Sequence, residues 1–395
     1  MLGAIYIGLS GLNAYSRGLQ TISNNVANLN SPGFKTTATN FSDIFSYGGG
    51  GLTFFSGLGA GSGNGVRFSE ARVDFGQGDL RQSDGDLDLA IQGSGFLVLL
   101  KDGKTYYTRT GQFVVNADGF VTQQGTDYRL GVLDGSGRAV ALNIDNRRTS
   151  APTATTLIKF ADNLSSSATT ATIADLAVFD SQGGRQTWQA KFDKVANSLG
   201  EWKVTVTDQD GITIGTQTLK FAGSSVDPAT NKLTFASSPA GAEPLSVVLD
   251  FSSGVTSFSA GTTSSLRAAS VDGNGVGTLT SVTVDDQGQL KLTYSNTKTE
   301  LLGAVALADF RDPQQLRRLS GGLFESSGSG PTRLLASGVD NIGRLLSKQS
   351  EASNVDLSQQ FGDLILIQRG FQASSQVVSV TNDMIQQLFG IRGQG

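Results

Sequence analysis

The stretch MLGAIYIGLSGLNAYSRGLQTISNNVANLN (Met1–Asn30) sets the first expectation for the fold. Its apolar residues recur every seven positions, a period that places them along one seam of a helix. They are Ile5, Leu12, Leu19 and Val26. The companion heptad positions are half polar, at Leu2, Leu9, Ser16 and Ser23. Pro32 disfavours a helical residue before it, so the helix is expected to stop within Asn28–Gly33.

The last forty residues repeat this design. Apolar residues are again spaced by seven, at Leu357, Leu364, Phe371, Val378 and Ile385. Their companions are mixed, at Phe361, Gln368, Ser375, Asn382 and Phe389. Asp356, with Gln359 three residues later, forms an N-capping pattern, and Gly390 supplies a stop. The pattern predicts one helix of about 34 residues, roughly 50 Å long at 1.5 Å per residue.

The two end helices are expected to pair as a coiled coil, and we assign their contact positions from the heptads. On the first helix these are Ile5, Leu9, Leu12, Leu19, Ile22 and Val26. On the second they are Leu357, Phe361, Leu364, Phe371, Val378 and Ile385. Outside the seams both segments are rich in Ser, Asn, Gln and Thr and poor in Lys and Glu, unlike a helix that faces water.

Such faces suit surroundings made of other protein. One hypothesis is therefore that both ends are disordered in the monomer and become helical on assembly into a polymer. Burial of five seam residues, at about 1.5–3 kcal/mol each, is largely offset by backbone ordering at about 1–2 kcal/mol per residue over thirty residues. The alternative, an ordinary intramolecular coiled coil, stays open on pattern alone.

The middle of the chain is rich in β-forming runs separated by turn signals. Examples are GFLVLL (Gly95–Leu100), TYYTRTGQFVVN (Thr105–Asn116) and EWKVTVTD (Glu201–Asp208). Asp118-Gly119 and similar pairs mark hairpin turns, and no strand–helix–strand alternation is visible. The expected fold is mainly β with long terminal α-helices, followed by two antiparallel all-β domains in series.

The corresponding division of the chain has four parts. Residues 1–30 and 356–395 form a terminal helical assembly domain. Residues 31–70 form a connecting segment that contains the glycine-rich loop Gly48–Gly65. Residues 71–145 and 285–355 form an inner β-domain, and residues 146–284 form an outer one.

Composition excludes several functions. The chain has no Cys and no His, which removes disulfides, thiolate zinc sites and histidine-based catalysis. Its net charge of −4, without a basic cluster, predicts no nucleic-acid binding, and no apolar run approaches the roughly 20 residues of a membrane span. Asp84, Asp86 and Asp88 alternate, but a calcium loop would need Gly and Glu where Leu89 and Gly95 stand. We predict no catalytic, cofactor-binding or metal-binding residue.

Three blocks of sequence resemble one known family. The first is SGLNAYSRGLQTISNNVANLNSPGFK (Ser10–Lys35). The second combines DLDLAIQGSGFLVL (Asp86–Leu99) with YTRTGQFVVNADGFV (Tyr107–Val121). The third is EASNVDLSQQFGDLILIQRGFQASSQVVSVTNDMIQQL (Glu351–Leu388). Together these blocks resemble the flagellar rod and hook proteins. The positions that match the motifs of that family are Asn24, Asn25, Asn28, Pro32, Gly33, Phe34, Asn354 and Asp356.

Rod and hook members share these blocks, and the middle of the chain distinguishes them. VFDSQGGRQTWQAKF (Val178–Phe192) resembles the opening of the outer domain of hook members, which the shorter rod members lack. DDQGQLKLTYSNTKTELLGAVALADFRDPQQL (Asp285–Leu316) is similar to the return into the inner domain. The nearest alternatives are a distal rod protein and, further away, a β-rich surface adhesin; a carbohydrate-active enzyme would require measurable turnover.

The resemblance implies a structural subunit that assembles into a flexible curved tube and transmits motor torque from rod to filament. It implies as partners other copies of the chain, the distal rod protein, the hook cap, the hook–filament junction proteins and the flagellar export apparatus. It also implies an extracellular flagellar location reached without a cleaved signal peptide, no cofactor and no membrane insertion.

Overall fold

The computed structural model describes residues 2–45, 63–69, 72–198, 200–238, 241–328, 331 and 333–392. These residues fall into two compact units. One contains residues 1–144, 283–291 and 301–395, and the other contains residues 145–282 and 292–300. The predicted glycine-rich loop Gly48–Gly65 lies outside the described residues up to residue 62.

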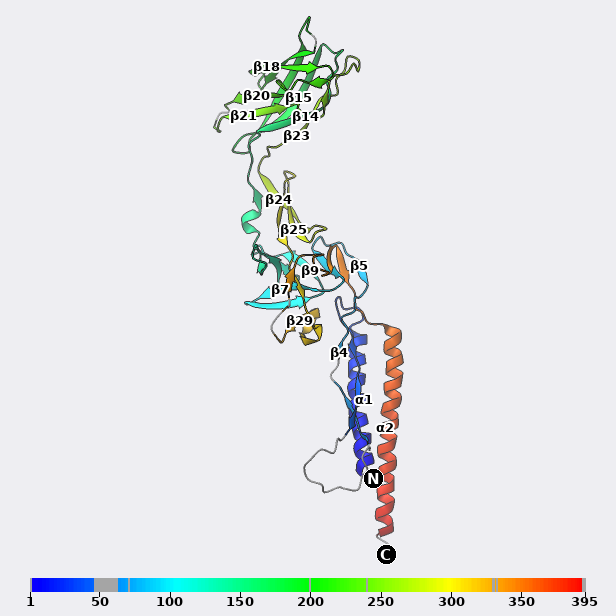
Figure 1. Cartoon of the computed structure of the whole chain (residues 1–395). Coiled ribbons are helices and arrows are strands. Elements are labelled where there is room, and N and C mark those ends of the chain that lie inside the picture. The colour runs from blue at the N-terminus through cyan, green and yellow to red at the C-terminus, as the bar shows by residue number, and fades with distance from the viewer. Residues whose placement is uncertain are drawn as a thin grey trace. The chain divides into compact units, whose positions relative to one another are not determined.

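Two long helices in the first unit come from the two ends of the chain. Helix α1 spans Leu2–Ala27 and α2 spans Leu357–Arg392. Figure 1 shows them side by side in opposite directions, with the start of α1 beside the end of α2. The prediction of paired terminal helices is confirmed, and α2 is slightly longer than expected.

The same unit contains a large sheet in the order β28-β29-β8-β7-β11-β10-β9-β6-β31, with β12, β27 and β30 attached at its side. Its strands are β6 (Asp88–Gln92), β7 (Phe96–Lys101), β8 (Lys104–Thr108), β9 (Thr110–Val115), β10 (Val121–Gln123), β11 (Arg129–Leu133), β12 (Ala139–Ala141), β27 (Leu307–Asp309), β28 (Leu316–Arg318), β29 (Leu323–Ser326), β30 (Arg333–Leu335) and β31 (Arg344–Ser347). Aromatic rings of Phe96, Tyr107 and Phe324 fill part of its core.

The β-rich run Thr105–Asn116 forms two strands that are divided at Arg109. Strand β8 pairs with β7 and β29, whereas β9 pairs with β6 and β10. Arg109 leaves the ladder at this point because its side chain turns into the interior, where it is 3% exposed.

Short strand pairs connect the helices to this sheet. Strand β1 (Thr37–Ala38) pairs with β4 (Arg72–Val73), β2 (Phe41–Phe45) with β3 (Gly63–Phe68), and β5 (Leu80–Gln82) with β32 (Gln349–Glu351). The segment expected to be only a connection therefore contains strands, and β2 and β3 form a hairpin whose β3 packs on α1.

The second unit is built on a sheet in the order β15-β16-β17-β18-β19-β22-β14-β21-β20, with β23 paired to β14. Its strands are β14 (Leu157–Asn163), β15 (Thr170–Phe179), β16 (Arg185–Lys194), β17 (Glu201–Thr207), β18 (Thr213–Ala222), β19 (Ser225–Val226), β20 (Lys232–Ser237), β21 (Leu245–Asp250), β22 (Val255–Thr256) and β23 (Arg267–Val271). Trp188 and Trp202 lie fully inside its core.

The prediction of purely antiparallel pairing is wrong for one strand of this unit. Strand β14 pairs in parallel with both β21 and β22. Parallel neighbours need a long connection, and here the chain runs through β15 to β20 before it returns beside β14. Turn signals reveal hairpins but not such a return, which is why the sequence pattern missed it.

A further sheet has the order β13-β24-β25-β26, formed by β13 (Thr149–Ser150), β24 (Gly277–Val284), β25 (Gln289–Tyr294) and β26 (Thr299–Ala304). The division between the two units passes through β24, β25 and β26.

Candidate assembly site

The face of α1 that contacts α2 is lined by small residues. Gly8, Gly11 and Gly18 are all buried. A Cβ atom added at Gly18 would lie 2.8 Å from Cδ1 of Ile367, and one at Gly8 would lie 2.6 Å from Cγ2 of Val378. The two helices therefore approach so closely that no larger side chain fits at these positions without a shift.

The heptad residues predicted from the sequence differ in their exposure. Half-buried positions are Ile5, Leu12, Leu19, Val26, Leu364, Val378 and Ile385. Exposed positions are Leu9, Leu357, Phe361 and Phe371. Ile22 is buried within the seam. The period of seven predicts where the helices lie. The face of α1 that contacts α2 is instead marked in the sequence by the spacing of Gly8, Gly11 and Gly18.

Several large apolar side chains of α2 are exposed, although Cγ1 of Val377 also lies 3.6 Å from where a Cβ of Gly8 in α1 would stand. Leu366 is 70% exposed, Phe361 50% and Met384 53%. Val377, Val380 and Leu388 are exposed as well. No described part of the chain covers this surface, which is apolar along much of its length.

The base of the helix pair is fixed by a buried amide pair. Asn25 is 1% exposed and donates from Nδ2 to Oε1 of Gln360 and to the carbonyl of Thr37, each at 2.9 Å. Its Oδ1 accepts from the amide of Thr37 at 3.1 Å. Because buried amides are costly unless all their groups are bonded, these contacts specify one register of α1 against α2.

A buried ionic cluster, which we call the clasp, lies where the two chain ends enter the sheet. It consists of Lys35, Arg109 and Glu351, whose side chains are at most 3% exposed. Nζ of Lys35 lies 2.6 Å from Oε1 of Glu351, and Nε of Arg109 lies 3.2 Å from its Oε2. Burial lowers the pKa of Lys35 and of Arg109, and the Glu351 carboxylate only partly opposes that effect.

Backbone groups complete the clasp. Lys35 also donates to the carbonyl of Gly76 at 2.7 Å, and the amide of Gly78 donates to Oε1 of Glu351 at 2.9 Å. Arg109 donates to the carbonyl of Gly93 at 2.6 Å. Residues 316 positions apart in the sequence, Lys35 and Glu351, are thus joined in the interior. The sequence blocks contained all three clasp residues, but their contact follows only from the fold.

The predicted motif residues lie around the clasp. Asn354 accepts from the amide of Thr36 at 2.7 Å through Oδ1 and donates to the carbonyl of Asp74 at 2.9 Å. Asp356 caps α2, since its Oδ1 accepts from the amide of Ser358 at 2.8 Å.

Gly33 and Phe34 continue the same junction. Gly33 has a φ of 68°, which favours glycine, and its amide donates to the carbonyl of Glu351 at 2.8 Å. Phe34 is buried beneath the guanidinium of Arg318, 3.7 Å from its ring centre. Pro32 is exposed.

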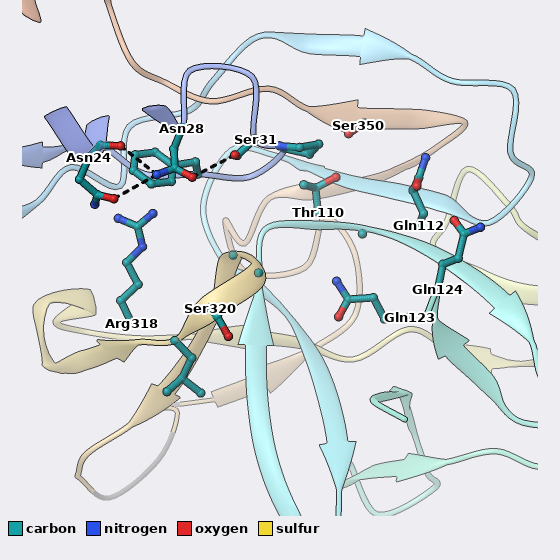
Figure 2. Close-up of a pocket in the computed structure, with 16 residues that line it drawn as sticks. Asn24, Asn28, Ser31, Thr110, Gln112, Gln123, Gln124, Arg318, Ser320 and Ser350 are labelled. Atoms are coloured by element: carbon teal, nitrogen blue, oxygen red, sulfur yellow. Dashed lines mark hydrogen bonds between the residues drawn. The ribbon is translucent and has the colours of Figure 1, made fainter. Parts of the chain in front are cut away.

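Asn24 and Asn28 face a polar cavity of about 770 Å³, drawn in Figure 2. Asn28 donates from Nδ2 to Oδ1 of Asn24 at 3.1 Å and accepts from the hydroxyl of Ser31 at 3.0 Å. Amides of Gln112, Gln123 and Gln124 and the guanidinium of Arg318 also line it. None of the described lining residues is a carboxylate, so they supply no acid–base pair.

The described residues contain no group of three or more side chains placed to hold a metal ion. Nor is any described helix long and apolar enough to cross a membrane. What the helix pair and its junction offer is a surface: two closely packed helices, anchored by polar contacts at one end, with apolar side chains facing outward.

Three parts of the chain match models of known protein families. Residues 5–35 match the family model described as "Flagella basal body rod protein", and residues 347–391 match "Flagellar basal body rod FlgEFG protein C-terminal". Residues 90–155 match "Flagellar hook protein FlgE/F/G D1 domain". The chain is therefore an axial structural protein of the flagellum.

Full-length relatives narrow the class. The flagellar hook protein FlgE of Rhizobium meliloti is 30% identical, with 99% of each chain covered. That of Escherichia coli K12 is 29% identical over 97% of this chain and 98% of its own. A solved structure, the Helicobacter pylori flagellar hook protein FlgE2, has 13% identity and a TM-score of 0.47, with 69% of this chain and 99% of that chain covered. The chain belongs to the flagellar hook protein FlgE family, whose members are structural proteins and not enzymes.

Proposed function

We propose that this chain is the repeating subunit of the hook, a flexible curved tube that passes torque from the rod to the filament. Membership of the hook family implies polymerisation in the flagellum. The finer proposal is that α1 and α2 drive this assembly, and that the subunit is exported unprocessed and added beneath a cap between the distal rod and the hook–filament junction.

The observation that supports assembly through the helices is their outward apolar surface. Leu366, Met384 and Phe361 are half or more exposed on a helix that carries few charges. Burial of one such side chain contributes about 1.5–3 kcal/mol. Contact with neighbouring copies would remove this surface from water, whereas a monomer leaves it exposed.

The test compares three chains by electron microscopy and sedimentation. The full chain is expected to form tubes, and a chain without residues 1–30 and 356–395 is expected to remain monomeric. Leu366→Gln with Met384→Gln should raise the critical concentration for assembly about a hundredfold, if each loses about 1.5 kcal/mol of burial. Ile212→Gln, a change at a side chain that is 64% exposed in the second unit, is the matched control. Tubes from the truncated chain would move the interface into the β-units and overturn the proposal.

A tube that bends while it rotates needs subunits that change length. We place this compliance in the segments Asn143–Ala154 and Thr278–Asp285. In support, the chain passes between its compact units at residues 144–145 and 282–283. It also passes between them at 291–292 and 300–301, inside β25 and β26. Strands resist extension more than coil does, so we expect a stiff hinge rather than a free joint.

Contacts between neighbouring outer β-units would slide during each turn. Their strands expose many Thr, Ser and Lys side chains and few large apolar ones, which suits contacts that break and re-form. An engineered disulfide between adjacent outer units tests this, because the chain has no cysteine of its own. Cross-linked hooks should lose bending, and unaltered bending would contradict the sliding proposal.

A further inference from the structure

A groove of about 400 Å³ lies between the outer face of α1 and the β2–β3 hairpin. Its walls include Tyr6, Leu9 and Arg17 from α1 and Ile44, Arg67 and Phe68 from the hairpin. Tyr6 is 61% exposed and Leu9 52%. The groove is apolar with two guanidinium groups at its side, and none of the described residues that line it is a carboxylate.

The hairpin wall is held against α1. The hydroxyl of Ser10 accepts from the amide of Val66 at 3.2 Å. The ring of Phe41 lies 5.3 Å from that of Tyr15 and 5.9 Å from that of Phe68. Because aromatic contacts and a hydrogen bond join the two walls, the groove is formed before any partner arrives.

The cations of this groove are available for a partner. Arg17 is the only charged residue of α1 and takes part in no ion pair with the described residues. Arg67 donates from Nε to the hydroxyl of Ser42 at 3.1 Å, a neutral partner that leaves its charge uncompensated.

The end of α2 presents a complementary surface. Val377, Val380, Met384 and Leu388 follow one another at helical spacing and are 41–53% exposed. Asp383 is the only charged residue between Gly370 and Ile391, and within the described chain no cation pairs with it.

Arg17 and Asp383 are too far apart to pair within one chain. Gly18 lies against Ile367, and the helices run in opposite directions with Gly8 against Val378. Asp383 follows Ile367 by 383 − 367 = 16 residues, which is about 24 Å along α2 at 1.5 Å per residue. Because the helices are antiparallel, Arg17 lies one residue closer to Asp383 than Gly18 does, so about 22 Å separates Arg17 from Asp383 along the helices. An ion pair needs its atoms within about 4 Å.

We propose that the groove of one copy receives the Val377–Leu388 face of α2 from a second copy, with Asp383 between Arg17 and Arg67. The proposal rests on the proposed assembly through the end helices. Apolar contacts of Tyr6, Leu9 and Phe68 supply most of the affinity, and the charges fix the register. Copies that point the same way along the tube are then displaced by about 22 Å along their helices.

A charge exchange tests the contact. Arg17→Asp and Asp383→Arg should each raise the critical concentration for tubes about tenfold, because each places like charges together. The double variant should assemble better than either single variant, because the exchanged charges at 17 and 383 attract again while the guanidinium at 383 also faces Arg67. Lys203→Asp, at an exposed position of the second unit, makes the same change in net charge as Arg17→Asp and is its control. Unaltered monomer melting should accompany all variants, since neither residue has an ionic partner among the described residues of its own chain.

A second measurement does not depend on assembly in vitro. Hooks isolated from cells that produce Arg17→Cys and Asp383→Cys chains together should contain a disulfide-linked dimer of the two, in a protein otherwise free of cysteine. Single variants that assemble normally, a double variant as poor as the worse single one, or hooks without the dimer would each overturn the docking proposal. Assembly of the truncated chain would instead overturn the proposed function itself.

Discussion

The core of the second unit and the seam between the end helices are built on opposite plans. In the second unit the largest side chains are inside: Trp188 is 0% exposed, Trp202 1%, and the rings of Phe160 and Phe251 stack at 4.6 Å. In the helix pair the seam contains glycines, whereas Leu366 and Met384 face outward. A unit that buries its own large apolar residues leaves little apolar surface in water. The helix pair leaves such surface exposed, and the proposed assembly would cover it with other copies of the chain.

The two plans also differ in what specifies the structure. Shape complementarity of apolar rings determines the second unit. The helix pair depends on buried polar contacts, namely the Asn25–Gln360 pair and the clasp of Lys35, Arg109 and Glu351. Polar contacts of this kind are directional, so they select one register without much apolar burial.

The largest effect is expected when the clasp is cut. Glu351→Gln keeps the shape but leaves two buried cations without their carboxylate, which should destabilise the first unit by about 5 kcal/mol. Denaturant unfolding followed by amide exchange would show whether the loss is confined to that unit. Glu325→Gln, which removes a largely exposed pair with Arg317, is the control and should cost at most about 1 kcal/mol. Equal effects of the two changes would show that the clasp does not anchor the chain ends.

A somewhat smaller loss is expected from the apolar core. Trp188→Ala should destabilise the second unit by about 4 kcal/mol, because it leaves a large cavity. The fluorescence of Trp202 during unfolding reports on this unit. Assembly of the helices should persist at temperatures where the unit stays folded. Loss of tubes under those conditions would break the comparison, because it would make the core of the second unit a requirement for assembly through the helices.

The glycine seam should respond to a single methyl group. Gly18→Ala places a carbon 2.8 Å from Cδ1 of Ile367 and 3.2 Å from Cζ of Phe41, and should cost about 1–3 kcal/mol of helix pairing. Gly362→Ala meets nothing within 4 Å and should stabilise α2 by up to about 1 kcal/mol. Circular dichroism and tube formation measure both. A stabilising Gly18→Ala would mean that the helices do not approach closely at this point.

The smallest effect is expected at a turn that lies neither in the core of the second unit nor in the seam between the end helices. The carboxylate of Asp134 accepts hydrogen bonds from the Ser136 hydroxyl and from the amides of Arg138 and Ser136, which lower its pKa from 3.8 to about 2. An acid with a depressed pKa contributes stability above its ordinary pKa and loses it as the pH falls through about 2. A carbon-13 titration should give this pKa in monomers and tubes alike, and Ser136→Ala should raise it. A change on assembly would place this turn in a contact between copies.

The helices themselves could be read from the sequence, because a period of seven and the capping residues are local properties. Asp356 at the start of α2 is an example, since a cap needs only the next three residues. The β-runs were visible for the same reason, as alternation and turn residues act over a few positions. The return of β14 beside β21 was not, because it depends on where a distant strand finds a free edge.

The sequence by itself therefore determined the helical ends, the β-rich middle and the absence of cysteine and histidine chemistry. Only the tertiary structure decided which face of α1 meets α2, and that Lys35, Arg109 and Glu351 share one buried site. The heptad period predicts that a helix has an apolar side. Which side of α1 packs against α2 depends on where the two backbones can approach each other closely. The contact of three charges separated by up to 316 positions is a product of chain folding, and no local pattern encodes it.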